Sequence, residues 1–388
     1  MYEEPIIEGE YEEAPVETIS DDELVQICMD EASNALHGES DESISLPLDY
    51  YYGRKPLLKH CKDPSASTLV SMDVHDAIES TVAEVMPAFG GGHIADFEAE
   101  TEEDEEQAKV ESDVCNYLLM EKYNGLEVLT TGLKDCLLHR NGYAKVYWDR
   151  KYVVTFDSYQ QVPQEQIQQI MQPRSEGEEV EIASHEEVAP PEEVQAQHEQ
   201  MMAQAGEQGQ EPPQMPGFFD ITLKRTIVKS QPVIESTPPE ESLVDETLQC
   251  VDLTRARFTC HRNIVSKSEL IAHGYDRALV ENLSEYSGAS ISNYSRHRND
   301  YNGFSPHDST KNVEVYECYV RVDRDGDGIA ELRRVVISNN QLLDDVEWDE
   351  TDMIAGATCI MPHQHQGVSM YDMQKDIQDA KTDLLRSV

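Results

Sequence analysis

The apolar residues of this chain change their spacing at Asn141 and Gly142. Upstream they recur every three to four residues, which is the period of one helix face, and Val74, Ile78 and Val82 are an example. Downstream, apolar and polar side chains alternate with the period of a β-strand. A region of helix patterns is therefore followed by a region of strand patterns.

Abrupt changes of composition divide the chain further. Residues 1–19 are acidic and interrupted by proline, so we expect a disordered tail. Residues 157–219 are rich in Gln, Glu and Pro and cannot bury enough apolar surface to offset the entropy of ordering, which predicts a disordered insertion. Strand patterns resume at Asp220, so the insertion interrupts one sheet, and 20–156 and 220–362 are expected to form the ordered part.

Local signals mark turns and helix starts. Asp149 and the arginine after it are expected to form the turn between two short strands. Ser20, followed by three acidic residues, is typical of the start of a helix. Ser266 begins a capping box, in which a Glu follows three residues later. Ser369 is predicted to cap a last helix within 363–388.

Acidic residues strongly outnumber basic ones. The chain has 30 Lys and Arg against 77 Asp and Glu, a net charge of −47 at pH 7. This balance argues against a protein that binds nucleic acid by neutralising phosphates. The excess of acidic side chains can keep the protein soluble, or it can form a surface that DNA passes without binding to it. The carboxylates of 98–106 are expected to be solvated, because consecutive acids point in all directions around a helix.

The cysteines and the apolar runs indicate the compartment. The eight cysteines form no Cys-x-x-Cys pair, and most lie in apolar runs, which is typical of free thiols in a reducing environment. The N-terminus lacks the pattern of a signal peptide, and no apolar run approaches the roughly 18 residues of a membrane span. We therefore expect a cytosolic protein that does not enter a membrane.

An Asp- and Gly-rich segment resembles a calcium loop in part. Aspartates occupy the first, third and fifth positions and a glycine the sixth, namely Asp323, Asp325, Asp327 and Gly326. The twelfth position is Arg334 where a bidentate Glu is expected, and the flanks have strand patterns, so an EF-hand is not predicted. Two interpretations remain open: a solvated hairpin turn, and a weak calcium site that uses the three aspartates with Glu331.

No motif for catalysis is complete. His363 and His365 have no Cys or carboxylate beside them at ligand spacing, so we expect capping or surface histidines. Ser369 lacks the second glycine of a nucleophile elbow. The glycines at 90–92 follow a helix, whereas phosphate-binding loops follow a strand. We therefore expect no enzyme, no catalytic residues and no cofactor apart from calcium.

Short segments spread over residues 70–388 occur in a characteristic order. They are 70–79 with 86–87, 116–119, 134–138 with 141–148, 238–240, 269–270 with 274–276, 323–328 with Glu331, and 367–369 with Gln374 and Arg386. In this order they resemble the N-terminal part of the portal proteins of short-tailed bacteriophages.

The resemblance implies a structural protein of the virion. Members of this family form a ring, usually of twelve subunits, at one capsid vertex, after assembly in the host cytoplasm. Double-stranded DNA passes through the channel of the ring during packaging and ejection, without sequence-specific binding. The expected partners are further copies of the chain, the terminase large subunit, tail adaptor proteins at the head-tail connector, and capsid or scaffolding protein.

The resemblance also implies an α+β fold, in which wing-type helices pack with antiparallel strands and the chain ends in a helix at the start of the stem. Family chains are usually considerably longer, and 363–388 ends inside an amphipathic helix with the apolar face Met373, Ile377, Leu384 and Leu385. We therefore expect a truncated stem helix, without the clip, the returning stem helix and the crown, in a fragment or a split or truncated gene product. The length of the 157–219 insertion is a second departure from the family.

Two other functions remain open. One is an acidic, partly disordered adaptor or scaffold-type interaction protein with a small α+β core and weak calcium binding. The other is a metal-dependent nuclease built on the acidic clusters. Rings in negative-stain images would favour the portal, a monomer that binds a partner through its tails would favour the adaptor, and plasmid cleavage abolished by EDTA would favour the nuclease.

Overall fold

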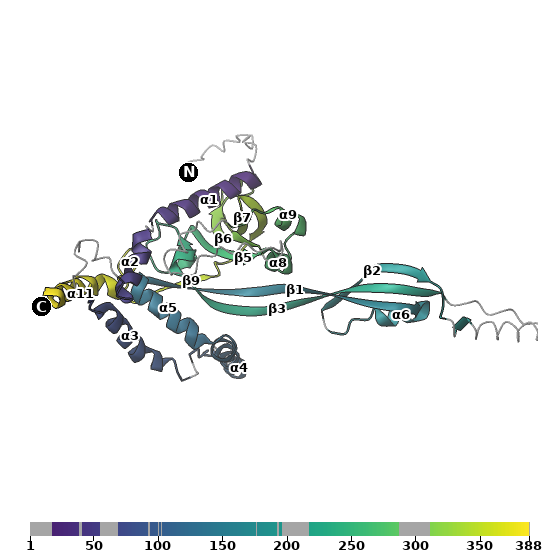
Figure 1. The fold of residues 1–388 in the computed structure, drawn as a ribbon, viewed down its shortest axis with the longest axis horizontal. Helices are drawn as coiled ribbons and strands as arrows, with labels where there is room; N and C mark the ends of the chain where they lie inside the picture. The colour runs from purple at the N-terminus through teal and green to yellow at the C-terminus, as the bar shows by residue number, and fades with distance from the viewer. Residues whose placement is uncertain are drawn as a thin grey trace, which may run out of the picture. The chain divides into compact units, whose positions relative to one another are not determined.

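The computed structural model describes residues 18–38, 41–54, 69–91, 94–99, 101, 103–175, 177–191, 194–195, 217–286 and 311–387. Within them the chain forms helices and antiparallel strands, which confirms the α+β class (Figure 1). Two compact units are present: unit 1 comprises 1–147, 232–271 and 275–388, and unit 2 comprises 148–231 and 272–274. Apart from 18–19, the predicted acidic tail lies outside the described residues.

Unit 1 contains most of the helices and a five-stranded sheet. Its longer helices are α1 (Asp21–Gly38), α2 (Asp41–Tyr51), α3 (Asp73–Val85), α4 (Glu105–Asn116), α5 (Gly125–His139) and α11 (Met370–Ser387). Its shorter ones are η2 (Met86–Ala88), η3 (Tyr117–Lys122), η4 (Pro239–Glu241), η5 (Leu253–Arg255), α8 (Lys267–Ala272) and α9 (Arg277–Asn282). The sheet has the antiparallel order β4 (Ser242–Val244), β5 (Phe258–Ser266), β6 (Asn312–Val322), β7 (Glu331–Ser338), β8 (Gln341–Glu347).

Helix α1 covers the five-stranded sheet. Leu24, Cys28 and Ala32 recur on one helix face and are fully buried against residues such as Phe258 and Ile337. Helix α1 begins after Ser20, as the sequence predicts, and its start is a capping box: the Ser20 amide donates to Glu23 Oε2 at 2.9 Å, and the Glu23 amide donates to Ser20 Oγ at 3.3 Å. The first core of unit 1 therefore lies between this helix and the sheet.

A second core joins four helices. Buried side chains from α2, α3, α5 and α11 meet there, among them Leu48, Ile78, Leu137 and Tyr371. Directly after α5 the chain enters β1 (Asn141–Pro163), whose first residues pair antiparallel with β9 (Met353–Ala357). Gly142 is required at this junction, because a Cβ there would lie 2.3 Å from the carbonyl oxygen of Gly132 in α5. The helices and the start of β1 are thereby closely packed.

A buried group of charges connects β1 to the five-stranded sheet. The carboxylate of Glu317 on β6 forms an ion pair with Lys145 of β1 and accepts from Arg334 Nε of β7 at 2.7 Å. Tyr319 donates to Asp352 at 2.9 Å beside this group. Burial alone would raise the pKa of Glu317, but the two cations outweigh burial and hold this pKa at about 2. Glu317 is therefore ionised at every physiological pH.

Removal of the central charge should destabilise unit 1. We expect Glu317→Gln to lower the free energy of unfolding by about 3 to 5 kcal/mol, because the buried Lys145 then loses its ion-pair partner and Arg334 keeps only Asp344, at 3.2 Å. Urea unfolding followed by circular dichroism measures the loss. The control is Glu281→Gln, which removes the exposed pair with Arg277 on α9 and should leave stability nearly unchanged. Equal losses in the two variants would contradict this account of Glu317.

His261 makes stability depend on pH. It lies directly opposite Glu317 in the register of β5 and β6 and is buried. Burial, together with repulsion from Lys145, lowers the pKa of His261 from 6.5 to about 4. An unfolded chain binds a proton on this imidazole near pH 6.5, whereas the folded chain does so only near pH 4, so acid favours the unfolded state in this window.

The wild-type protein should therefore lose stability between pH 6.5 and pH 4.5, by at most about 1.4 kcal/mol per pH unit from this one group. His261→Gln removes the titrating imidazole, and we expect the pH dependence of its unfolding free energy to be shallower across the same window. Urea titrations of both proteins at several pH values give the two slopes. Parallel slopes would show that the imidazole of His261 has the same pKa in the folded and unfolded states, which would contradict this account.

Strand β1 continues through Asp149, so the predicted turn at this position is wrong. The alternation of exposure along β1 is unbroken there. The Asp149 carboxylate is buried, with Lys151 Nζ at 3.3 Å and His273 Nδ1 at 3.5 Å. A two-residue hairpin needs residues that adopt positive φ, typically Asn-Gly. Neither Asp149 nor Arg150 has a positive φ.

The prediction of a disordered insertion over 157–219 is wrong for the part that the structure describes. This part contains the end of β1, helix α6 (Gln164–Ile170) and strand β2 (Glu178–Val188). Strand β3 (Phe218–Thr237) follows, and the strands lie in one sheet of order β2-β3-β1-β9, as the resumed strand pattern predicts. Residues 192–193 and 196–216 lie outside the described residues.

Polar contacts explain how so polar a segment is ordered. Arg225 of β3 is buried and forms ion pairs with Asp157 at 3.0 Å and Glu178 at 3.1 Å. The same guanidinium donates to the carbonyl oxygen of Ile170 at 2.8 Å, at the end of α6. One arginine thus connects β1, β2 and α6. Composition alone misses it, because the partners are distant in the sequence.

Candidate functional sites

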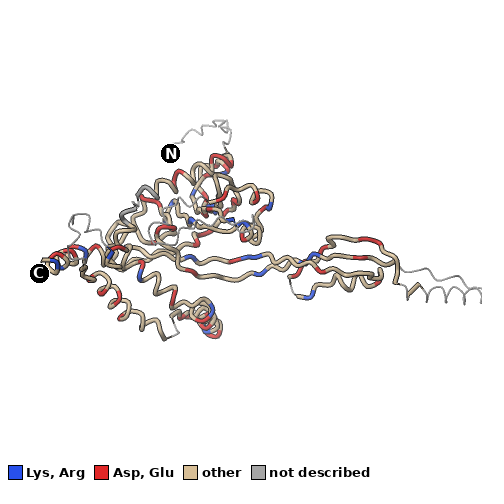
Figure 2. The backbone as a smooth tube through the Cα atoms, in the orientation of Figure 1, with Lys and Arg blue, Asp and Glu red and all other residues tan. Residues whose placement is uncertain are grey.

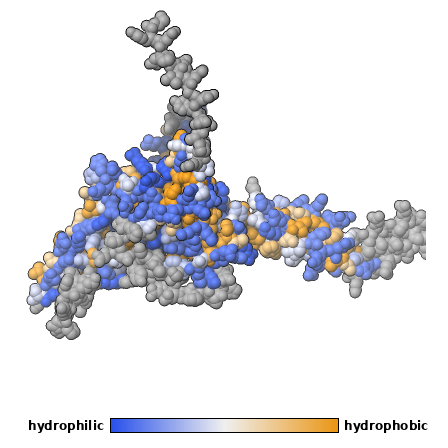
Figure 3. All heavy atoms as spheres, turned by 90° about the horizontal axis from the view of Figure 1, so that it is seen from above, coloured by the Kyte–Doolittle hydropathy of each residue, from blue (hydrophilic) through white to orange (hydrophobic). Residues whose placement is uncertain are grey.

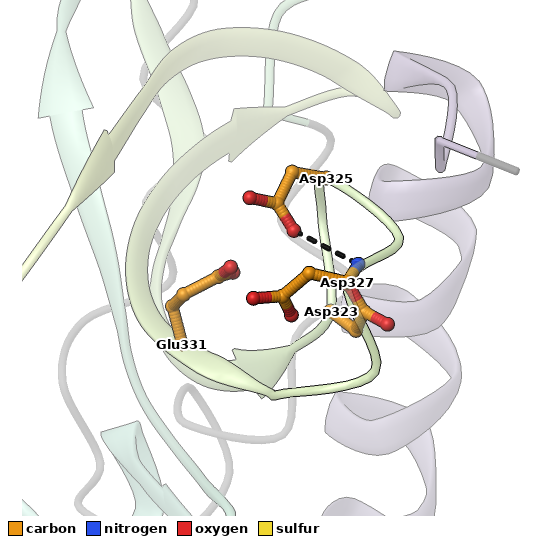
Figure 4. A group of neighbouring side chains, drawn as sticks. All are labelled: Asp323, Asp325, Asp327 and Glu331. Atoms are coloured by element: carbon orange, nitrogen blue, oxygen red, sulfur yellow. Dashed lines mark hydrogen bonds between the residues drawn. The ribbon is translucent and has the colours of Figure 1, made fainter. Parts of the chain in front are cut away.

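The loop between β6 and β7 gathers four carboxylates. One oxygen from each lies within 4.8 Å of the others, and the residues are Asp323, Asp325, Asp327 and Glu331 (Figure 4). The first three follow the predicted pattern, and the start of β7 adds the fourth. Arg334, at the twelfth position, donates instead to Glu317. The loop is therefore a hairpin connection and not an EF-hand.

Backbone amides of the loop are directed at its own carboxylates. Gly326 and Gly328 have φ of 82° and 89°, and their amides donate to the two carboxylate oxygens of Asp323 at 2.7 and 2.8 Å. The Asp327 amide donates to Asp325 Oδ1 at 3.1 Å. These bonds are typical of a tight Asp-Gly turn, and each carboxylate keeps further lone pairs. The geometry agrees both with the turn and with a weak site for a hard cation.

Arg324 attaches the loop to neighbouring elements. Its guanidinium forms hydrogen bonds with the carbonyl oxygen of Ile19 and with Asp21 at the start of α1. Its Nε lies 3.5 Å from Asp345 Oδ2 on β8. One positive charge therefore lies among the acidic groups and fixes the loop against α1. This cation also reduces the net negative charge available to a bound metal ion.

The described carboxylates of residues 98–106 do not converge on a common site. Every described acid between residues 98 and 106 is exposed. The segment before α4 is held instead by amide groups: Asn116 Oδ1 accepts from the amides of Ile94 at 2.7 Å and Ala95 at 3.0 Å. In the described part of the chain, the loop at 323–331 is the one group of three or more metal-ligand side chains that lie close together. The solvated surface predicted for this run is thus confirmed.

The two histidines of the sequence pattern do not form a ligand pair. His365 Nε2 lies 3.0 Å from the Tyr143 hydroxyl, and its Nδ1 lies 3.0 Å from the carbonyl oxygen of Cys250. Burial lowers the pKa of His365, which favours the neutral ring. Both ring nitrogens are therefore occupied within the protein. His363 is exposed.

Helix α11 buries polar residues and exposes apolar ones. Ser369 caps it, as predicted, by accepting from the Asp372 amide at 3.0 Å. On the buried side, Gln378 accepts from the Val74 amide at 2.9 Å, and Thr382 accepts from the Ser71 amide at 3.1 Å. The four apolar residues that the sequence groups on one face are between 48% and 67% exposed, namely Met373, Ile377, Leu384 and Leu385.

The comparisons with known proteins agree with this architecture. None of the curated proteins searched matches the chain. None of the described helices combines the length and the apolar character needed to cross a bilayer. The family model described as phage SU10 portal protein matches residues 23–388, which include both units and nearly every described residue. The resemblance to phage portal proteins is thereby confirmed, and the chain belongs to the phage SU10 portal protein family.

Proposed function

We propose that the chain is a structural subunit of a ring at one vertex of the phage capsid, through which double-stranded DNA enters during packaging and leaves during ejection. The observation that supports this most directly is the match to the SU10 portal family over residues 23–388. The partners in this proposal are further copies of the chain in a ring of twelve, the terminase large subunit, tail adaptor proteins, and capsid or scaffolding protein. The role is non-enzymatic and belongs to the assembled virion.

The exposed face of α11 supports the ring. Apolar side chains such as Leu384 and Leu385 are left uncovered, whereas the buried side of the helix is satisfied by hydrogen bonds to α2 and α3. Contiguous exposed apolar residues are typical of protein contacts. We assign α11 to the start of the stem and the elements before it to the wing.

The charge supports passage of DNA without adhesion. Figure 2 shows Asp and Glu on both units, and the chain has a net charge of −47. In a ring, this charge is repeated around the axis, and a polyanion is repelled from such a wall. This repulsion lowers the affinity of the channel surface for DNA phosphates, so DNA can move through the ring without being held.

A ring test addresses the proposal. Negative-stain images and mass photometry of the full-length gene product should show closed rings. Leu384→Asp introduces a charge on the exposed face of α11 and should reduce the ring fraction without unfolding the chain, because the side chain is 67% exposed. Leu279→Asp is the matched control on an exposed leucine of α9 and should assemble like the wild type. A wild-type protein that stays monomeric would instead favour the adaptor function.

A second candidate property is weak calcium binding by the loop at 323–331. The convergence of four carboxylates favours it. We expect isothermal titration with millimolar calcium to give a binding signal that Asp325→Asn weakens and that Asp349→Asn, at an acid outside the cluster, leaves unchanged. Absence of heat in the wild type, with an intact fold, would leave the loop as a hairpin turn alone.

A further inference from the structure

Strand β1 exposes a row of large apolar side chains in unit 2. Trp148, Tyr152, Val154 and Phe156 are between 42% and 64% exposed. All four are even-numbered, and alternate residues of a strand share one face. We call this surface the ribbon face. Figure 3 shows apolar residues, in orange, along this part of the chain.

Strand β3 contributes to the same face. Trp148 forms a hydrogen bond with Ser230, and the Ser158 hydroxyl lies 3.3 Å from that of Thr222, so the even-numbered positions of β3 lie beside those of β1. Val228 extends the apolar area and is 39% exposed. The ribbon face therefore spans two neighbouring strands.

The opposite face is covered on β3 over residues 221–225. Ile221, Leu223 and Arg225 are odd-numbered residues of β3 and are almost completely buried. Arg225 donates to carbonyl oxygens at the end of α6, which places that helix on the odd-numbered side. The two sides of β3 therefore differ over this segment: the odd-numbered side chains are buried within the unit, and the large apolar side chains of the ribbon face are not. Large bare apolar areas of this kind mark interaction surfaces.

Charge distinguishes the ribbon face from the rest of the chain. From Trp148 to Phe156, and from Thr222 to Ser230, no even-numbered position is Asp or Glu, although the chain has 77 of them. The charged side chains at these positions are Arg150 and Lys224. The adjacent β2 borders the face with two exposed acids on the same side, Glu179 opposite Thr226 and Glu181 opposite Lys224, and Glu181 pairs with Lys224 at 3.1 Å. Aromatic residues and arginine without carboxylates are typical of interface cores.

We propose that the ribbon face binds a second copy of this chain in the assembled ring. A ring closes by head-to-tail contacts, so each copy needs two different surfaces. With a net charge of −47, two copies repel over most of their surface, and the strands β1 and β3 of the ribbon face offer arginine, lysine and aromatic side chains without carboxylates to an acidic partner surface. The inference rests on the proposed function, because it assigns one of the two surfaces of that ring.

Photo-cross-linking tests the contact directly in the full-length gene product. A benzophenone amino acid replaces Phe156 on the ribbon face, and in a matched protein it replaces Thr155, an exposed residue whose side chain lies on the opposite face. Irradiation of the assembled protein should give dimer bands several-fold stronger from position 156 than from position 155. Mass spectrometry of the dimer should identify a peptide of this same chain. Phe156→Ser should also lower the ring fraction, because it removes an aromatic side chain from the contact. The fold should stay intact, since this side chain is 64% exposed.

The outcomes separate the two proposals. Rings that form without cross-links from position 156, or with equal cross-links from both positions, would overturn the ribbon-face contact and leave the portal function intact. Cross-linked dimers without rings would support the contact and overturn the ring. Cross-links to a capsid, tail or terminase protein in infected cells, in place of this chain, would overturn the contact with a second copy.

Discussion

The ion pairs of Glu317 join strands that also share a hydrophobic core, in which Tyr143, Tyr319 and Leu332 are buried together. Glu317 lies on β6, Lys145 on β1 and Arg334 on β7, so one carboxylate joins the start of the long strand to the centre of the five-stranded sheet. The cost of burying these charges is recovered only when all of them are present with good geometry. This requirement favours one register of β1, β6 and β7. His261 lies opposite Glu317 on β5, and burial keeps its ring neutral at neutral pH.

Sequence patterns predict the elements of this fold better than their connections. Helix α1 and its cap at Ser20 follow from local chemistry, because capping boxes and helix faces depend on residues three or four apart. The course of β1 through Asp149 does not, since the buried carboxylate lies not only 3.3 Å from Lys151 but also 3.5 Å from the ring of His273, which is distant in the sequence. Arg225 explains the order of a Gln- and Glu-rich segment in the same way.

In the loop at 323–331, too, some features follow from the local sequence and others depend on distant parts of the chain. The spacing of Asp323, Asp325 and Asp327 is local and is visible in the sequence, and the carboxylates do converge. The attachment of Arg324 to Ile19 and Asp345 is not visible, because it depends on how α1 and β8 pack. Exposure is likewise a property of the fold: amphipathic patterns identify apolar faces on α11 and β1, but only the structure shows that these faces are uncovered within one copy.

The junction between α11 and β1 has a mechanical consequence. Arg140, which precedes β1, binds both carboxylate oxygens of Asp372 at 2.8 and 3.1 Å, and Asn141 accepts from the Gly367 amide and donates to the carbonyl oxygen of His365. These four bonds cross from the first residues of the strand to the first turn of the helix and its approach. A force on α11 therefore acts on several short polar bonds at the same time. Because these bonds resist displacement together, a movement of the helix is transmitted to the start of the strand.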